Sequence, residues 1–196
     1  MGLRVECLYG VEISPVLEEL ADLRIRIFRD FPYLYDGSED YERAYLATYT
    51  KCPDSIVVLC WEGDHLVGAS TGLPLAAEVD EFRAPFLKAG INDKALFYCA
   101  ESVLLPEYRG KGVYRQFFDA REKHARALGL SACVFCSVVR PDDHPLRPEN
   151  YQSLDPIWKH MGYQPMAGIR TSFAWKDVDA SGESTKPMQF YLKNLF

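Results

Sequence analysis

The chain has 196 residues, of which 48% are hydrophobic and 26% charged, so it is long enough for one ordinary soluble domain with a substantial core. Its 28 acidic and 22 basic residues give a net charge of −6, which argues against a general nucleic-acid binder. No stretch approaches the ~20 apolar residues of a membrane helix, and the start lacks the pattern of a secretory signal. We therefore expect a cytoplasmic protein with no nucleic-acid partner and no membrane partner.

The first half of the chain predicts a strand, two helices and a β-hairpin. Residues 3–8 alternate as in a strand, and Ser14 is placed to cap a helix that keeps an apolar stripe until about Phe28. After a loop with proline and glycine, Ser38 is placed to cap a second helix. Two β-rich runs within 55–75 flank a turn, which predicts the hairpin.

The second half predicts three helices alternating with strands, and then two final strands. Residues 78–91 suit a short helix or covering loop, and 95–105 form a long apolar strand that ends at Pro106. The further segments are a helix over 112–128, a buried strand over 131–139, a short helix near 154–162, and strands over 168–176 and 186–195. We find no repeat and no linker. The prediction is one mixed α/β domain over residues 1–196.

Cys133 and Cys136 form a C-x-x-C pair, which can indicate zinc binding or redox chemistry. Residues three apart on a strand point to opposite faces, however, and no second pair completes a ligand set. We expect reduced, buried cysteines and no metal.

The segment "LLPEYRGKGVYRQFF", residues 104–118, places two glycines and two cations where a strand ends and a helix begins. N–H groups at a helix start are unpaired and carry the positive end of the helix dipole, and glycines let a phosphate come close. The pattern therefore predicts an anion site, with a tight connection that binds nothing as the alternative. It is neither a P-loop, because Val113 follows Gly112, nor a Rossmann turn, because Arg115 replaces the third glycine.

"EYRGKG", residues 107–112, after an apolar strand resembles the Q/R-x-x-G-x-G/A pyrophosphate turn of the GNAT acetyltransferase superfamily, with Glu107 in the first place. "DPIWKHMGY", residues 155–163, is similar to a later helix and turn of that family, and the order of elements also agrees. The resemblance implies a central mixed, mostly antiparallel sheet flanked by helices. It also implies N-acetyltransferase activity with acetyl-CoA as the acyl donor and no metal.

The resemblance further implies which residues hold acetyl-CoA. In this family the fourth and fifth strands splay apart and the pantetheine arm pairs with the main chain of the fourth, here about Val103 to Leu105. Amides from Arg109 to Tyr114 would hold the pyrophosphate, and nearby cations would add charge unless they are only solvated. The full set is Val103, Leu104, Leu105, Arg109, Gly110, Lys111, Gly112, Val113, Tyr114, Arg115 and Trp158. Tyr114 departs from the family, which often has a small residue at that place.

Two catalytic roles follow from the same resemblance. Trp158 stands where many relatives have a tyrosine acid, and an indole cannot act as an acid, so Tyr151 is our candidate, with Tyr98 and Cys99 as further ones. The alternative is that the thiolate, whose pKa lies near that of ordinary thiols, leaves without a dedicated acid. Glu101 interrupts an apolar strand and is the candidate base; the alternatives are a structural ion pair with an arginine and a side chain that faces solvent on the outer side.

The loop "FPYLYDGSEDY" supplies the candidate substrate residues Tyr33, Tyr35, Asp36 and Tyr41, which suit a cationic amine with an aromatic flank. Aromatic core contacts are the alternative. We therefore predict acetyl transfer to the amine of a small molecule by direct attack. The alternatives are a non-catalytic acyl-CoA sensor or scaffold and a protein-amine acetyltransferase. The last strand either closes the sheet or pairs across a homodimer.

Overall fold

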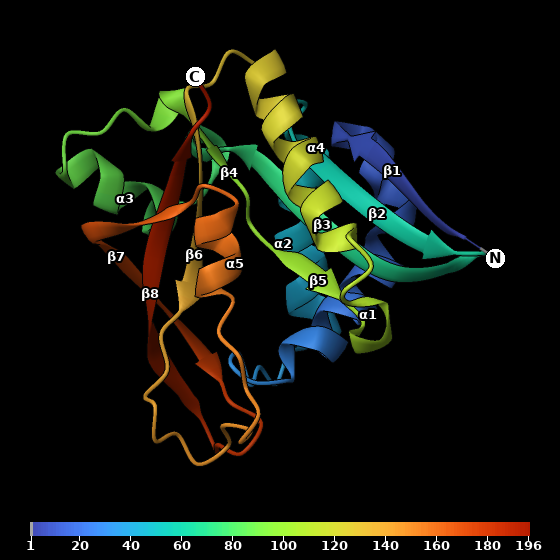
Figure 1. Cartoon of the computed structure of the whole chain (residues 1–196), viewed down its shortest axis with the longest axis vertical. Coiled ribbons are helices and arrows are strands. Elements are labelled where there is room, and N and C mark those ends of the chain that lie inside the picture. The colour runs from blue at the N-terminus through green and yellow to red at the C-terminus, as the bar shows by residue number, and fades with distance from the viewer. Residues whose placement is uncertain (1) are drawn as a thin grey trace.

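The computed structural model describes residues 2–196, which form an eight-stranded sheet covered by helices (Figure 1). The strands are β1 (Leu3–Tyr9), β2 (Ile56–Glu62), β3 (His65–Pro74), β4 (Leu96–Tyr98), β5 (Ser102–Leu104), β6 (Ala132–Val138), β7 (Gln164–Lys176) and β8 (Glu183–Asn194). Their order is β1-β2-β3-β4-β6-β8-β7, and β5 pairs with β3. Only the β4–β6 pairing is parallel. The predicted mixed, mostly antiparallel sheet is confirmed.

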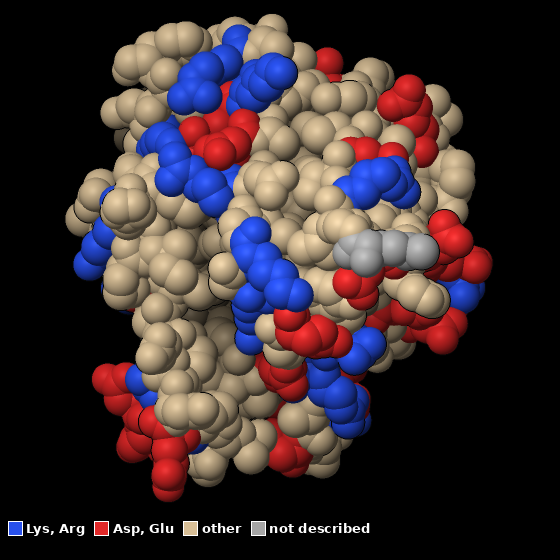
Figure 2. All heavy atoms as spheres, turned by 45° about the vertical axis from the view of Figure 1, so that its right-hand side comes forward, with Lys and Arg blue, Asp and Glu red and all other residues tan. Residues whose placement is uncertain are grey.

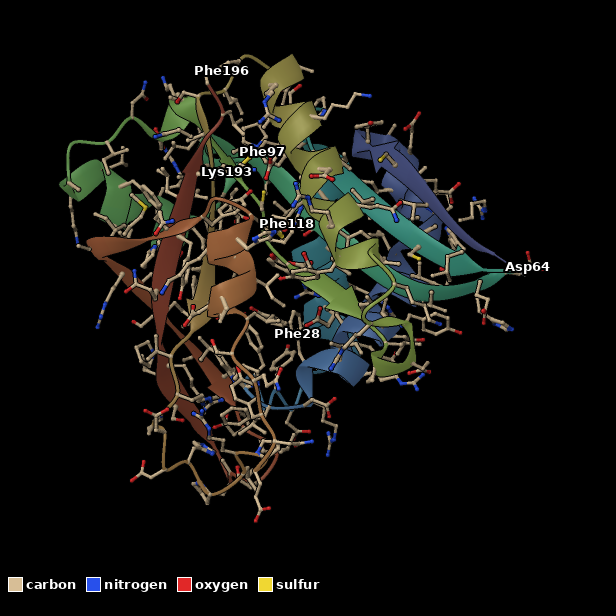
Figure 3. The ribbon with its side chains drawn as sticks, in the orientation of Figure 1. Phe28, Asp64, Phe97, Phe118, Lys193 and Phe196 are labelled. Carbon is tan, nitrogen blue, oxygen red and sulfur yellow. The ribbon has the colours of Figure 1, made fainter. Side chains whose placement is uncertain are left out.

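Helices lie on both faces of this sheet. They are α1 (Leu17–Phe28), α2 (Glu39–Lys51), α3 (Asp80–Lys88), α4 (Val113–Ala127) and α5 (Asp155–His160). In Figure 1, α4 and α5 lie in front of the strands, and α1 and α2 lie behind them. Phe118 of α4 packs on Phe135 of β6 at 5.8 Å between ring centroids, in the region between α4 and α5 (Figure 3). On the other face, Phe86 of α3 packs on Phe190 of β8 at 4.8 Å.

The starts of the first two helices differ in how well they were predicted. Ser38 does cap α2, since its Oγ accepts a hydrogen bond from the Tyr41 amide. Ser14 does not cap α1, and that prediction is wrong. Glu12 accepts a hydrogen bond from the Tyr9 amide at 3.1 Å, so a 3-10 turn begins at Gly10 and α1 starts only after it.

The single strand predicted over 95–105 is broken into β4 and β5. At the break, the Thr71 amide donates to the Glu101 carbonyl and the Ala100 amide donates to the Thr71 carbonyl, both at 3.1 Å. Arg121 of α4, only 1% exposed, donates to the same two carbonyl oxygens, Thr71 and Glu101, and to Ser102 Oγ. A buried guanidinium therefore holds the break open, which strand propensity alone cannot predict.

A gap opens in the sheet beyond this break, as the resemblance implies. β4 pairs with β6 only over Leu96–Tyr98, and the last bond of this pairing runs from the Cys99 amide to the Val134 carbonyl. Farther along, β5 pairs only with β3, and the end of β6 pairs only with β8. The two strands therefore diverge, and each presents one main-chain edge to the gap.

Charges of both signs lie on the face of the molecule drawn in Figure 2. On the face drawn in Figure 2, basic and acidic side chains are interspersed and do not form one basic surface. Within residues 2–196, no helix has both the length and the apolar character needed to cross a membrane. Cys133 and Cys136 are buried free thiols.

Candidate active site

The glycine turn lies between β5 and α4. Gly110 and Gly112 have φ of 73° and 78°, in the left-handed region that disfavours other residues, and α4 begins at Val113 with no side-chain cap. A Cβ added to either glycine would meet nothing within 4 Å. The first-turn N–H groups of α4 have no side-chain cap, and the space beside both glycines is open, as a seat for an anion requires.

The three predicted cations of this turn are exposed and each already has a neighbour. Arg109 Nε donates to the Leu104 carbonyl at 3.3 Å, Lys111 Nζ lies 4.9 Å from the ring centroid of Tyr108, and Arg115 pairs with Asp119 at 3.0 Å. These contacts are weak enough for a phosphate to replace them. The Arg109 amide donates to the Pro106 carbonyl, so the main-chain seat starts after Arg109.

The residues predicted to bind the pantetheine arm differ in the direction of their main-chain N–H and C=O groups. The Leu105 amide donates to the Val67 carbonyl, and Val103 lies opposite Ala69, so both residues direct their main chain toward β3. Leu104 and Ser102 alternate with them and direct theirs toward the gap. Of the predicted segment, Leu104 is thus the residue placed to pair across the gap, and Ser102 is the neighbour that sequence reasoning missed.

A hydrogen bond joins α4 to α5 above the gap. Trp158 Nε1 donates to the Tyr114 hydroxyl at 2.9 Å, and the indole packs on Phe135 and Tyr191 at 4.9 and 5.0 Å. Burial raises the pKa of Tyr114, although the bond from Trp158 opposes this, so the hydroxyl keeps its proton at neutral pH. Because Tyr114 accepts from Trp158, its own O–H remains able to donate elsewhere.

Glu101 lies on the opposite face of the sheet, where it pairs with Arg24 and accepts a hydrogen bond from the Tyr45 hydroxyl at 3.3 Å. Arg24 also donates to Glu42. Burial alone would lower the pKa of Arg24, but Glu101 and Glu42 hold it well above its ordinary value, so this cation is permanent. The structural ion pair considered for Glu101 is present, and its role as a base stays a prediction.

The predicted substrate residues do not form one cluster of free groups. Tyr33 packs between Phe28 and Trp175, at 4.7 and 6.1 Å between ring centroids, and burial raises its pKa. Asp36 is paired with Arg29 and Lys176, and these bonds lower its pKa.

The two remaining substrate candidates lie on the α2 side. Burial, and secondarily Glu42, raise the pKa of Tyr35. Tyr41 is 61% exposed, while Glu42, Leu46 and Tyr49 form the buried face of α2. Tyr41 is thus the most exposed of the four, and their common role in substrate binding stays a prediction.

Arg140 holds the loop that carries Tyr33, a role that no local sequence pattern indicates. Its guanidinium donates to the carbonyls of Pro32 and Tyr33 at 2.7 and 2.6 Å and forms two bonds with Asp177, at 2.8 and 2.9 Å. Bidentate geometry of this kind is rigid. It ties the α1–α2 loop to the β7–β8 hairpin.

Tyr151 lies in the loop between β6 and α5, beside a hollow of about 210 Å³ at the end of β6. Its ring packs edge-on against Phe31 at 4.7 Å, and Trp158 and Tyr191 line the same hollow. The other acid candidates are enclosed, since the Tyr98 hydroxyl lies 3.2 Å from Cys136 Sγ and burial raises the pKa of Tyr98. Tyr151 is therefore the most accessible of the predicted acids.

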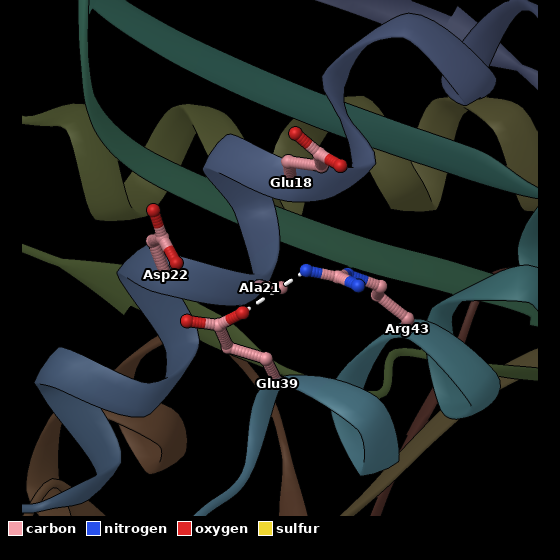
Figure 4. Close-up of a pocket in the computed structure, with 5 residues that line it drawn as sticks. All are labelled: Glu18, Ala21, Asp22, Glu39 and Arg43. Atoms are coloured by element: carbon pink, nitrogen blue, oxygen red, sulfur yellow. Dashed lines mark hydrogen bonds and ion pairs between the residues drawn. The ribbon is translucent and has the colours of Figure 1, made fainter.

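A second, smaller hollow of about 130 Å³ lies between α1 and α2 (Figure 4). Glu18, Asp22 and the ion-paired Glu39 and Arg43 line it, with Ala21 at its base. These are charged groups at a helix–helix groove, on the face of the sheet opposite α4. The residues that line it do not include those of the glycine turn.

Comparisons with known proteins agree with this geometry. The sequence profile of the acetyltransferase (GNAT) family matches residues 17–148, from α1 to beyond β6. No curated protein matches the sequence significantly.

Among solved structures, an N-acetyltransferase from Staphylococcus aureus shares the fold with a TM-score of 0.60, 13% identity and full coverage of both chains. An aminoglycoside 6'-N-acetyltransferase complexed with coenzyme A matches at 0.60 and 15% identity over 97% of each chain. A proposed acetyltransferase from Salmonella typhimurium, yncA, solved with acetyl-CoA, matches at 0.60 and 12% over 100% of this chain and 95% of its own. These identities show the fold alone, but the profile covers most of the chain, which therefore belongs to the GNAT acetyltransferase family.

Proposed function

We propose that the protein transfers the acetyl group of acetyl-CoA to the amine of a small molecule. The observation that carries this proposal is the open glycine turn at the start of α4, beside the main-chain edge that β5 presents to the gap. A turn of this kind suits a pyrophosphate, and a strand edge suits the amide groups of a pantetheine arm. Structural neighbours solved with acetyl-CoA or coenzyme A support the same donor.

The chemistry is direct attack. The amine nitrogen bonds to the thioester carbonyl carbon, the carbon–sulfur bond breaks, and the sulfur leaves with the bonding electrons as a thiolate. A base must take one proton from the nitrogen, and the thiolate must gain one. Tyr114 holds a proton that it can donate at the gap, which makes it a candidate acid beside the predicted Tyr151.

A small acceptor suits the surroundings better than a peptide. The hollow beside Tyr151 measures about 210 Å³, and four aromatic residues line it together with two arginines and two aspartates. Arg140 holds the α1–α2 loop against the hairpin on the same side, which favours a closed pocket over an open groove. Aromatic walls favour a cationic amine.

One observation favours the second candidate, an acyl-CoA sensor without turnover. Trp158 stands where many relatives have a tyrosine acid, and its indole N–H is donated to the Tyr114 hydroxyl, so the usual acid is missing at that place. Such a protein could bind acyl-CoA at the glycine turn without transferring its acyl group.

The test compares two glycines that have nearly the same backbone conformation. Gly112 and Gly129 have φ of 78° and 74°, and neither has an atom within 4 Å of an added Cβ, so alanine imposes similar strain of about 1–2 kcal/mol at both. Only Gly112 borders the proposed seat. By calorimetric titration, Gly112→Ala should weaken acetyl-CoA binding at least about tenfold, equivalent to about 1.4 kcal/mol, and Gly129→Ala should leave it unchanged.

Acetyl transfer is then measured as thiol release with 2-phenylethylamine, tyramine, butylamine and spermidine. Transfer to any of them supports the proposed enzyme. Equal acetyl-CoA affinity of Gly112→Ala and wild type would refute the turn as the seat. Tight binding without transfer to any of the four would favour the sensor.

A further inference from the structure

Two arginines line the hollow beside Tyr151, and they differ in how many of their nitrogens have a partner. Arg140 donates from Nε, Nη1 and Nη2 to Asp177 and to two main-chain carbonyls. Arg147 forms one ion pair, from Nη1 to Asp142 at 2.8 Å, and within residues 2–196 its Nε and Nη2 make no hydrogen bond. Arg147 therefore offers one edge of its planar fork to a ligand in the hollow.

The surroundings of Arg147 suit an incoming carboxylate. Its guanidinium lies 5.1 Å from the ring centroid of Tyr151, and this cation–π contact holds it at the wall of the hollow. Its partner Asp142 is 98% exposed, so their ion pair is solvated and weak. Carboxylates bind arginine through two parallel N–H bonds, and Nε and Nη2 can supply both of them.

An aspartate of the same hollow has an oxygen left for a cation. Asp155 Oδ1 accepts the hydrogen bond of the Tyr191 hydroxyl, and within residues 2–196 its Oδ2 has no hydrogen-bond or ion-pair partner. Trp158, three residues later on α5, lines the hollow too, and its indole bonds to Tyr114 above the gap. Because residues three apart on a helix are neighbours, Asp155 lies at the side of the hollow that leads to the gap.

The charges of Arg147 and Asp155 both act on the Tyr151 hydroxyl. Burial raises the pKa of Tyr151, the charge of Arg147 lowers it, and the charge of Asp155 raises it. One hydroxyl thus senses both groups, which therefore lie on neighbouring parts of the wall. The hollow of about 210 Å³ is smaller than the about 300–1,000 Å³ of pockets for drug-sized ligands. It suits a small molecule with a cationic and an anionic group close together.

We propose that the acceptor is an amino acid, with its ammonium group held at Asp155 and its carboxylate held by Nε and Nη2 of Arg147. The inference rests on the proposed function and names the acceptor class of the same site. A phosphate in place of the carboxylate is disfavoured, because its larger negative charge would lie beside Asp142 and Asp155. The two residues bind and orient the acceptor, and the transfer step is the one given above.

The first arm of the test measures binding without turnover. L-Phenylalanine, L-tyrosine and L-norvaline differ from 2-phenylethylamine, tyramine and butylamine only by a carboxylate, which gives three matched pairs. Each compound is titrated by calorimetry, with coenzyme A present, into wild type, Arg147→Gln and Arg43→Gln. Arg43 is the control because it forms a similar exposed ion pair, with Glu39 at 3.0 Å, on the opposite face of the sheet.

At least one amino acid should bind at least about tenfold more tightly than its amine in wild type and in Arg43→Gln, and Arg147→Gln should abolish this advantage. Asp155→Asn, whose amide oxygen can still accept from Tyr191, should weaken both members of that pair at least about threefold. No binding of any amino acid, equal affinity within all three pairs, or an advantage that persists in Arg147→Gln would overturn the acceptor class. Unchanged affinities in Asp155→Asn would overturn the role of Asp155.

The second arm measures thiol release from acetyl-CoA with the same six compounds. Arg147→Gln should raise the KM of the preferred amino acid at least about tenfold and leave that of its amine unchanged within about twofold. Transfer to the amines with no preference for their amino acids would overturn the amino-acid acceptor and leave the proposed function standing. Carboxylate-dependent binding without transfer to any compound would overturn the proposed function, and the acceptor role with it.

Discussion

Replacing Glu78 by glutamine should change how the stability of the protein depends on pH. The pKa of this carboxyl is about 7 in the folded protein, against an ordinary value of 4.5, because burial disfavours its charged form. At about 1.36 kcal/mol per pKa unit, the difference corresponds to about 3 kcal/mol of unfolding free energy. Little of this is lost to solvent screening, since Glu78 is only 6% exposed.

The direction follows from proton binding. Between pH 4.5 and 7 the folded protein keeps the proton on Glu78 and the unfolded chain has released it, so wild type loses stability as the pH rises through this window. Above about pH 7 the Glu78 carboxyl is ionised in both the folded and the unfolded state, so its contribution to the unfolding free energy no longer changes with pH. Glutamine does not titrate. The stability of Glu78→Gln relative to wild type should therefore rise by about 3 kcal/mol between pH 4 and pH 8.

The assay is urea unfolding of both proteins at several pH values across that range, with Glu107→Gln as the control. Glu107 is exposed in the turn before α4, so its replacement should shift stability by less than about 0.5 kcal/mol at every pH. A constant difference between Glu78→Gln and wild type from pH 4 to pH 8 would show that Glu78 has an ordinary pKa, and would refute the reasoning.

Three other substitutions test the contacts around the gap and the loop. Tyr114→Phe leaves the Trp158 N–H without its acceptor and should cost about 1 kcal/mol in urea unfolding; an unchanged stability would mean that the bond across the gap is not formed. Arg140→Gln releases the loop that carries Tyr33 and should raise the KM of the amine while acetyl-CoA affinity stays constant, as calorimetry and steady-state kinetics can check. Arg24→Met leaves two buried carboxylates without their cation and should cost about 3–5 kcal/mol, whereas a smaller loss in denaturant would indicate that water reaches them.

Much of the fold could be predicted because its signals are local. The cap at Ser38 and the glycines of the turn before α4 depend on a few consecutive residues, and the structure shows the same cap and the same turn. The alternation of strands and helices is read from side-chain periodicity, and the predicted order of elements agrees with the structure except that the strand over 95–105 is two strands. The family resemblance depended on the same short segments, and the profile match confirms it.

Where local signals competed, the sequence misled or stayed silent. Serine is a common helix cap, so Ser14 was a reasonable candidate. Glu12 accepts a hydrogen bond from the Tyr9 amide, however, and a 3-10 turn begins before Ser14 is reached. The run over 95–105 has the composition of one strand, and the buried Arg121 divides it. The sequence therefore determined which segments become helices and strands, and that a glycine turn opens α4.

Only the tertiary structure decided what the polar side chains of the site do. Burial and pairing depend on contacts between residues far apart in the chain, and periodicity carries no information about them. Glu101 meets Arg24 across the sheet, and Trp158 meets Tyr114 across the gap. Glu78 is an acidic residue shortly after a strand, and only the structure shows that it is buried with no ion pair to any of residues 2–196.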